Sequence, residues 1–287
     1  MNFGLGNELK LAFPDINPII IPTVSNYLIQ DPNWLSGFVS DPFKNIRFYS
    51  TGIRHKESGR SLCTNLVLWG TNLSSTTGER YTRSQLAMVQ LPLHIRSIMV
   101  GLILSDAWIT FDSTRSKNAL MGFSQSVSNS SYLWFVFNLL SHYYSSYPRL
   151  VTSVRKGERL YALQFKTRAM PCITELKSLF YPELSKIKVI PANIYELLTP
   201  VVLAHLIMGD GGFKSKGIFL CTDSYTIQDT VRLMNVLILR YELKCTFHRA
   251  SNGIGYRIYI SRNSVSKVVK LVKPYFTPSM YYKLGGV

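Results

Sequence analysis

The sequence predicts an α+β protein built from two similar subdomains, each with the element order αββαββα. Two apolar segments of helix length each run into an aspartate, "VGLILSDA" at 100–107 and "LAHLIMGDG" at 203–211. When the chain is compared with itself, the segment 159–182 also lies over 255–278 at about the same phase. Strands in both segments alternate apolar and polar residues. We therefore expect two antiparallel sheets related by a pseudo-twofold axis.

The second pair of segments sets the phase of the repeat. A constant offset of 95 residues pairs Tyr161 with Tyr256, Leu163 with Ile258, Phe165 with Ile260, Leu176 with Leu271, Phe180 with Tyr275 and Lys188 with Lys283. Asp106 and Asp210 lie 104 residues apart, so the first copy has about nine extra residues, which we assign to loops. We expect an irregular extension over 1–90, a first subdomain over 91–195 and a second over 196–287.

Each copy contains the same elements in the same order. An apolar helix that ends near the aspartate comes first, followed by a strand pair around "ALMGFSQS" or "GIFLCTDS". The next helix is "SSYLWFVFNLLSHYY" in the first copy and "IQDTVRLMNVLILRY" in the second. A hairpin and a last helix complete each unit.

Composition narrows the class of partner. The chain has 32 Lys and Arg against 16 Asp and Glu, a net charge of +16, which favours a polyanion, above all nucleic acid. A hydrophobic content of 46% argues against a disordered chain, and the longest apolar run, 98–104, is too short to span a membrane. The four cysteines show no zinc-binding spacing. A merely basic protein and a membrane-surface protein remain less favoured alternatives.

The polar faces of the predicted hairpins supply candidate DNA contacts. Alternation places Tyr161, Leu163 and Phe165 on the core face of one hairpin, and Tyr256, Ile258 and Ile260 on that of the other. Side chains that oppose these, or that lie in neighbouring strands and turns, can read phosphates and base edges. An ordinary solvated strand face stays open for any single one of them. The candidates are Arg155, Lys156, Gln164, Lys166, Arg168, Lys214, Lys216, Lys244, His248, Arg249, Arg257 and Tyr259.

The two aspartates require a compensating charge. A carboxylate at the C-terminal end of a buried helix lies at the negative pole of the helix dipole, which disfavours it by roughly 0.3–1 kcal/mol. Two such helices packed about a pseudo-twofold would bring Asp106 and Asp210 together, where Mg²⁺ can bind carboxylates, substrate phosphates and water. Either motif alone is more typical of a core helix followed by a turn. Their duplication in a strongly basic chain favours a metal-dependent phosphodiesterase.

These residues resemble a known family. "MVGLILSDA" (99–107) and "LAHLIMGDG" (203–211) are similar to the two signature helices of LAGLIDADG homing endonucleases, of the single-chain type encoded in organellar introns. The resemblance covers about residues 60–287. It includes "WGTNL", "KVIPANIYELLTP", "CTDS", "LKC" and "VKPYFTPSMYYKL".

The resemblance implies saddle-shaped sheets over a long DNA target, and it assigns a role to several residues. Asp106 and Asp210 fall on the metal-binding acids, with Ala107 and Gly211 as the adjoining metal-site positions and two or three divalent ions in all. The candidates for supporting catalytic roles are Lys188 and Lys283 near the scissile phosphates, and Gln125 and Asp223 just outside the metal shell.

Some residues depart from the family pattern. Leu104 and Met208 replace the first acid of the motif, whereas the metal-binding acid is the later one. Ala107 stands where Gly is usual, and His205 stands where a small or aromatic residue packs between the helices. We interpret His205 as a core residue. None of these changes removes a predicted metal ligand.

The sequence therefore predicts a Mg²⁺-dependent, site-specific endonuclease that cuts double-stranded DNA as a monomer and promotes intron mobility. The alternative is an intron-encoded RNA maturase that uses the same fold to bind its host intron RNA, and a degenerate DNA-binding module is a third reading. The retained acids favour cleavage. Mitochondrial residence follows from the resemblance, and we expect no membrane partner.

Overall fold

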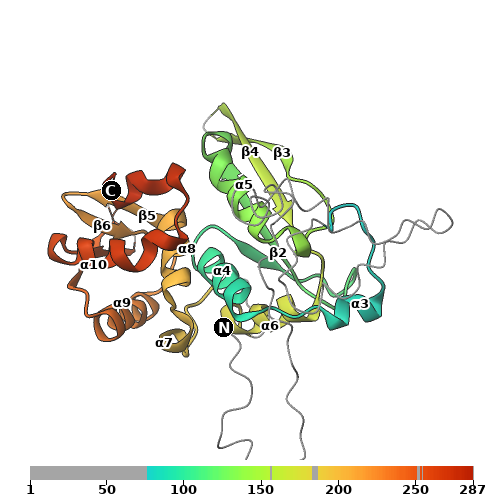
Figure 1. The fold of residues 1–287 in the computed structure, drawn as a ribbon, viewed down its shortest axis with the longest axis horizontal. Coiled ribbons are helices and arrows are strands. Elements are labelled where there is room, and N and C mark those ends of the chain that lie inside the picture. Colours follow the sequence, from blue (N-terminus) through green and yellow to red (C-terminus); the bar gives the residue numbers. More distant parts are fainter. Residues whose placement is uncertain (1–75, 156, 183–186, 251–252, 254, 287) are drawn as a thin grey trace, which may run out of the picture. The chain divides into compact units, whose positions relative to one another are not determined.

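A computed structural model describes residues 76–155, 157–182, 187–250, 253 and 255–286 of the chain (Figure 1). Most of the predicted extension over 1–90 lies outside these residues. Its described end contains the short helix α3 (Arg83–Met88), which begins with a capping box: Gln85 N donates to Thr82 Oγ1, and Thr82 N donates to the Gln85 side chain over 2.8 Å. The boundaries proposed at 90/91 and 195/196 remain predictions.

The predicted order αββαββα is confirmed in both copies. In the first copy the elements are α4 (Leu93–Leu104), β1 (Trp108–Thr110), β2 (Leu120–Ser126), α5 (Ser130–Leu139), β3 (Arg149–Arg155), β4 (Glu158–Lys166) and α6 (Pro171–Phe180). After the short helix α7 (Ile194–Leu197), the second copy has α8 (Pro200–Asp210), β5 (Gly211–Lys214), β6 (Gly217–Leu220), α9 (Ile227–Tyr241), β7 (Cys245–Arg249), β8 (Tyr256–Ile260) and α10 (Arg262–Val272). The 3-10 helices η5 (Lys273–Tyr275) and η6 (Pro278–Leu284) follow α10.

The two sheets have the same topology. Their strand orders are β1-β2-β4-β3 and β5-β6-β8-β7, with every neighbouring pair antiparallel. Phe123 pairs with Phe165 in the first sheet and Ile218 pairs with Ile260 in the second, and all four side chains are buried. One face of each sheet therefore contributes to the core, as the alternation predicts.

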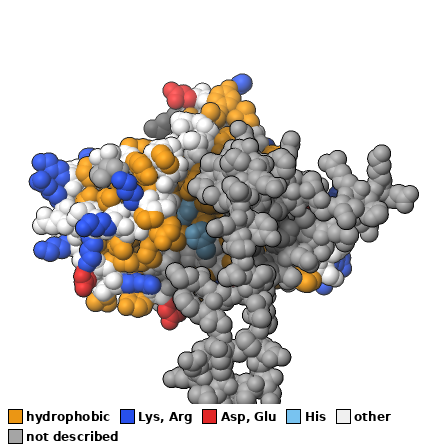
Figure 2. Space-filling view, viewed as in Figure 1, with side chains coloured by type: hydrophobic (Ala, Val, Ile, Leu, Met, Phe, Trp, Pro, Cys, Tyr) orange, Lys and Arg blue, Asp and Glu red, His pale blue; other side chains and the backbone are white. Residues whose placement is uncertain are grey.

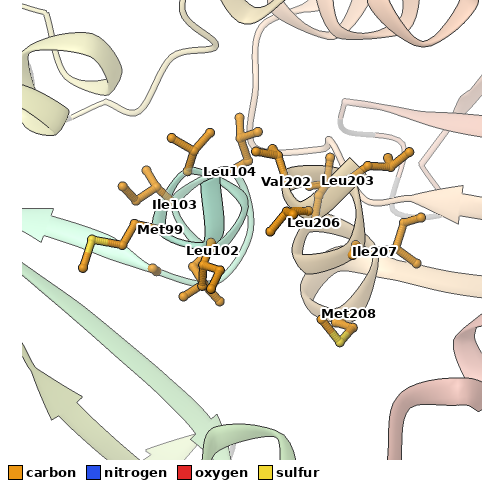
Figure 3. Packing of buried hydrophobic residues seen from close by; sticks show 14 of the residues in the cluster. Met99, Leu102, Ile103, Leu104, Val202, Leu203, Leu206, Ile207 and Met208 are labelled. Atoms are coloured by element: carbon orange, nitrogen blue, oxygen red, sulfur yellow. The ribbon is translucent and has the colours of Figure 1, made fainter. Parts of the chain in front are cut away.

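Helices α4 and α8 pack side by side between the two sheets (Figures 1 and 3). Val202 and Leu206 of α8 point toward α4, whereas Ile207 points to the opposite side (Figure 3). The helices are apolar almost all round because each contacts its partner helix as well as its own subdomain. Close approach depends on Gly101, where an added Cβ would lie 2.7 Å from both the Cβ atom of His205 and the carbonyl oxygen of Val202.

The interpretation of His205 as a core residue is confirmed. Its side chain is 1% exposed and stacks on Phe135 with ring centroids 6.3 Å apart. Burial lowers the pKa of the imidazole to about 3, so the ring is neutral at physiological pH.

The constant offset of 95 residues is wrong for the last helix of each copy. Four residues separate β4 from α6, but only Ser261 separates β8 from α10. The helices consequently begin at Pro171 and Arg262, and Tyr275, aligned with Phe180, lies in η5 beyond the end of α10. No helix in the described ranges is long and apolar enough to cross a membrane.

Candidate active site at the paired helices

Asp106 and Asp210 lie at the same end of the helix pair. Helix α4 ends at Leu104 and is capped by Ser105, so Asp106 follows directly, whereas Asp210 is the last residue of α8. A Cβ added to Gly209 would stand 2.3 Å from Ser105 Oγ and 3.2 Å from Asp106 Oδ2. Gly209 thus allows the end of α4 to reach the residue next to Asp210, which brings the two carboxylates to one place.

This juxtaposition disfavours ionisation of Asp210. Burial, the larger cause, and the negative charge of Asp106 together raise the pKa of Asp210 to about 7, although Lys188 and Lys283 oppose the shift. Two carboxylates that repel each other in a partly desolvated position fit a cation between or beside them. The described residues contain no cluster of three or more His, Cys, Asp or Glu that could hold a metal ion.

The two predicted lysines cap the ends of the motif helices. Lys188 Nζ donates to the carbonyl oxygens of Ile103 at 2.6 Å, Ser105 at 2.7 Å and Ala107 at 3.2 Å. Burial lowers the pKa of the Lys188 ammonium, and the nearby aspartates oppose that shift. The ammonium therefore neutralises the negative pole of α4 while it stays close to the carboxylates.

Lys283 does the same for the second helix. Its Nζ atom donates to the carbonyl oxygens of Met208 at 2.6 Å and Gly209 at 2.5 Å, from η6 at the end of the chain. Burial again lowers the pKa of the ammonium, opposed by Asp106 and Asp210. The structure thus places both predicted lysines at the aspartates, each on the helix of its own copy.

Gln125 and Asp223 occupy different environments. Gln125, on β2, donates from Nε2 to Asp106 Oδ2 over 2.6 Å. Asp223 is instead held by a fork from Arg257, with Nε to Oδ1 at 2.8 Å and Nη2 to Oδ2 at 2.7 Å. The Arg257 hydrogen bonds lower the pKa of the Asp223 carboxyl, which remains charged and committed to this partner. The two copies therefore share the aspartate but not the residue beside it.

Ala107 and Gly211 have no side-chain ligand to offer, so only their backbone could serve the predicted metal site. Ala107 is buried, and its carbonyl accepts a hydrogen bond from Lys188. Gly211 caps α8, with its N–H directed to the carbonyl of Ile207. Neither residue lies far from the aspartates.

The outer face of the second sheet carries most of its predicted DNA contacts. Cross-strand pairs Thr246–Tyr259 and His248–Arg257 lie opposite the face of buried Ile258. Lys214, which pairs with Gly217, shares this outer face, because a Cβ on Gly217 would strike the Tyr259 ring. Two further candidates, Lys244 before β7 and Lys216 in the β5–β6 turn, are exposed.

One candidate of this sheet is on the other face. Arg249 pairs with Tyr256, two positions along from the Phe247–Ile258 pair, and so lies on the core side of the sheet beyond the end of the core. The prediction that Arg249 belongs with His248 and Arg257 is therefore wrong in orientation, although the residue is exposed.

In the first sheet, the candidates Arg155, Gln164 and Lys166 lie on the outer face, but Arg168 does not. Arg168 follows the end of β4 and is 8% exposed. Its guanidinium donates to the carbonyl oxygens of Thr76 at 2.7 Å and Glu79 at 3.0 Å, and it lies 4.2 Å from the centroid of the Tyr81 ring. The prediction that Arg168 contacts DNA is wrong, because the alternation ends with the strand. Lys156 lies outside the described residues.

An aromatic cluster distinguishes the outer face of the second sheet. Phe219, His248 and Tyr259 lie with ring centroids 4.6 to 5.5 Å apart. These rings, together with the Lys and Arg side chains of the same face, suit a nucleic-acid surface that offers both phosphate and apolar contacts. Elsewhere on the second subdomain, the side seen in Figure 2, which includes α9 and α10, also has Lys and Arg side chains spread among hydrophobic ones and few acidic side chains.

Sequence reasoning missed Tyr225, which links the two copies at the site. Its hydroxyl, from the segment after β6 in the second copy, donates to the carbonyl oxygen of Leu104 in the first at 2.9 Å. Only its place directly after the "CTDS" segment gave a hint, and no periodicity marks it.

Comparisons with known proteins agree with this architecture. Residues 96–268 match the LAGLIDADG DNA endonuclease family. The chain is 33% identical to the cytochrome b mRNA maturase bI2 of Debaryomyces hansenii over 193 residues, 66% of this chain and 72% of the relative. It is 34% identical to the intron-encoded endonuclease ai4 of Dictyostelium discoideum over 132 residues, 46% of this chain and 80% of the relative.

A solved structure of the homing endonuclease I-WcaI bound to its DNA recognition sequence superposes with a TM-score of 0.62 and 26% identity, covering 68% of this chain and 87% of that one. The family match spans more than half of the sequence, and the fold of the chain is similar to that of a solved homing endonuclease. The chain therefore belongs to the LAGLIDADG homing endonuclease family.

Proposed function

We propose that this protein is a site-specific DNA endonuclease that hydrolyses one phosphodiester bond in each strand of a long duplex target. The observation that carries the proposal is the meeting of Asp106 and Asp210 at one end of the paired helices, beside the ammonium groups of Lys188 and Lys283. A pseudo-twofold arrangement of acids suits the two antiparallel strands of a duplex. The relatives named as intron-encoded endonucleases support the same activity and a role in intron mobility.

The repelling carboxylates fit a hard divalent cation, and we propose Mg²⁺, with two or three ions in all. Such ions take oxygen ligands and are commonly held by one or two carboxylates together with substrate phosphates and water. Bound there, the cation would supply charge stabilisation at the scissile phosphate and a water of lowered pKa. Asp106 and Asp210 would hold it, with backbone groups of Ala107 and Gly211 nearby.

The remaining residues hold this arrangement and the DNA. Lys188 and Lys283 neutralise the helix ends and place positive charge beside the aspartates, where the phosphate would bind. Gln125 fixes the orientation of the Asp106 carboxylate. The outer faces of the two sheets form the DNA surface, with the positioning contacts made by Lys and Arg and the base contacts by polar and aromatic side chains.

A second function, RNA maturase activity, is favoured by one specific observation: the relative with 33% identity is named a cytochrome b mRNA maturase. The name also supports a mitochondrial setting for this chain. A maturase needs the basic surface but not the paired acids, so the two functions separate on substitution of Asp210.

We propose that a monomer carries the endonuclease activity, because one chain already contains both acids.

The test is to incubate the purified protein with Mg²⁺ and a plasmid library of intron-insertion sites, and to map double-strand breaks by sequencing. We expect discrete cuts that disappear in Asp210→Asn while DNA binding persists. Absence of cuts, together with tight binding to the cognate intron RNA that Asp210→Asn does not change, would assign the maturase function instead.

A further inference from the structure

A short segment of the second subdomain connects the ends of the two motif helices. At its start, Cys221 N donates to the carbonyl oxygen of Asp210 over 2.9 Å. Four residues later, the hydroxyl of Tyr225 donates to the carbonyl oxygen of Leu104, also over 2.9 Å. Residues 221–225 therefore span the distance between one metal-binding acid and the helix that ends next to the other. We call them the bridging segment.

The bridging segment is held firmly from within its own subdomain. Thr222, 1% exposed, donates from Oγ1 to the carbonyl oxygen of Tyr256 over 2.6 Å, and Tyr225 N donates to the carbonyl oxygen of Thr222 over 3.1 Å. Gly255, at a φ of +77°, packs so tightly that an added Cβ would lie 2.6 Å from the Asp223 carbonyl oxygen. The Asp223 carboxylate is anchored by Arg257. A displacement of Tyr225 would have to disturb several of these bonds together.

The Tyr225 hydroxyl completes the set of donors at the end of α4. Lys188 serves the carbonyl oxygens of residues 103, 105 and 107, and Tyr225 serves the one at 104. The Lys188 ammonium also lies 5.9 Å from the centroid of the Tyr225 ring, within cation–π range. Burial raises the pKa of the Tyr225 phenol, so the hydroxyl keeps its proton as a neutral donor. Tyr225 thus touches both the helix end and its capping lysine.

The first copy does not repeat this device. Tyr225 lies two residues after Asp223, and the residue two after the matching Gln125 is Val127, which is exposed and has no hydroxyl to donate. Among the residues that the structure describes, Tyr225 is the tyrosine that donates to the end of a motif helix of the other subdomain.

From these contacts we propose that Tyr225 is a positioning residue that fixes Asp106 relative to Asp210 through Leu104. This proposal rests on the proposed endonuclease function. The hydrogen bond acts two residues before Asp106, at the point where the helix ends and the backbone is no longer fixed by helical bonds. Its loss would let the end of α4 shift without unfolding the subdomain, and misplacement of reacting groups by about 1 Å can cost on the order of 100-fold in rate.

The experiment compares Tyr225→Phe with a matched control, Tyr241→Phe. The Tyr241 hydroxyl also donates to a buried backbone carbonyl, that of Leu198 before α8, but it is remote from the aspartates. Both variants lose one buried hydroxyl–carbonyl bond, so similar falls in Tm are expected. At saturating DNA and Mg²⁺, we expect kcat of Tyr225→Phe to fall by about tenfold. Its KM should not change, and Tyr241→Phe should cut like wild type.

A second readout does not depend on cleavage. Mn²⁺ titrated into the free protein and followed by electron paramagnetic resonance should bind more weakly to Tyr225→Phe than to wild type or Tyr241→Phe. Equal kcat and equal Mn²⁺ affinity in the two variants would overturn the positioning role. Wild-type protein that cuts no target would instead overturn the proposed function, and the Mn²⁺ comparison would still decide whether Tyr225 places the acids.

Discussion

The two halves of the molecule share a topology but differ around the aspartate. In the first half, Gln125 donates directly to Asp106. In the second, Asp223 forms an ion pair with Arg257. The lysine caps are common to both halves, although Lys188 serves three carbonyl oxygens and Lys283 serves two. Features that neutralise the helix ends are thus retained in both copies, whereas the polar contacts around them have diverged.

This difference indicates which parts of the site act together and which act on one strand. Both acids face one shared region, where the negative charge of Asp106 contributes to the raised pKa of Asp210, so neither half is independent there. In the proposed endonuclease, the side chains beside them would meet different strands of the target and need not be equivalent. Substitutions at the shared core should therefore stop both cuts, and substitutions at the periphery should change one cut more than the other.

Apart from substitution of the acids themselves, the largest effect is expected from removing the helix caps. Lys188→Met and Lys283→Met each leave buried carbonyl oxygens without a charged donor, which costs about 2–3 kcal/mol of folding free energy. We expect cleavage of both strands to fall by about 100-fold. Lys188→Met should be the more destabilised because it loses three hydrogen bonds rather than two. Denaturant unfolding measures the folding free energy, and single-turnover cleavage measures the rate. Variants with the stability and the cleavage rate of wild type would refute the capping role.

The second effect is on the folding stability of the metal-free protein, which should depend on pH through Asp210. Because burial raises the folded pKa of Asp210 to about 7, this carboxyl destabilises the folded state progressively as the pH rises from about 4 to about 7. The free energy of unfolding of Asp210→Asn should therefore exceed that of wild type by about 3 kcal/mol at pH 8, and this difference should vanish near pH 4. Urea unfolding with a chelator present measures this, and a pH-independent difference would show that the raised pKa is wrong.

A third comparison sets a structural arginine against an exposed one. Arg168→Met removes the hydrogen bonds to Thr76 and Glu79 and should cost about 2 kcal/mol, with little change in the salt dependence of DNA binding. Arg155→Met removes a charge from the outer face of β3. It should leave stability almost unchanged and reduce the slope of log affinity against log salt by about 1. If Arg168→Met flattens the salt dependence as much as Arg155→Met, the corrected assignment of Arg168 fails.

The smallest effect tests the divergence of the two halves. Gln125→Ala frees the Asp106 carboxylate, and Asp223→Asn weakens the fork to Arg257. Each should slow one strand by several-fold, about 1 kcal/mol, and the slowed strand should differ between the two variants. Strand-specific end labels on a duplex target resolve the two cuts. Equal slowing of both strands by either variant would indicate that these residues also belong to the shared core.

The sequence predicted the order of elements, the paired acids and both lysines, because these depend on helix and strand periods and on a repeated motif. The sequence-based assignment of side chains to a sheet face failed for two residues. Arg168 lies beyond the end of β4, and Arg249 takes the opposite face because strand parity, not charge, decides orientation. The contacts of Tyr225 and the Asp223–Arg257 pair join residues far apart in sequence, so no local pattern could reveal them.

The central claim is that Asp106 and Asp210 form one shared site rather than two independent ones. The direct measurement is strand-resolved cleavage of the mapped target by wild type, Asp106→Asn and Asp210→Asn, with DNA affinity measured in parallel. Each single substitution is expected to abolish both cuts while binding persists. If either variant still cuts both strands at the wild-type rate, or each cuts one strand normally, the shared site is contradicted.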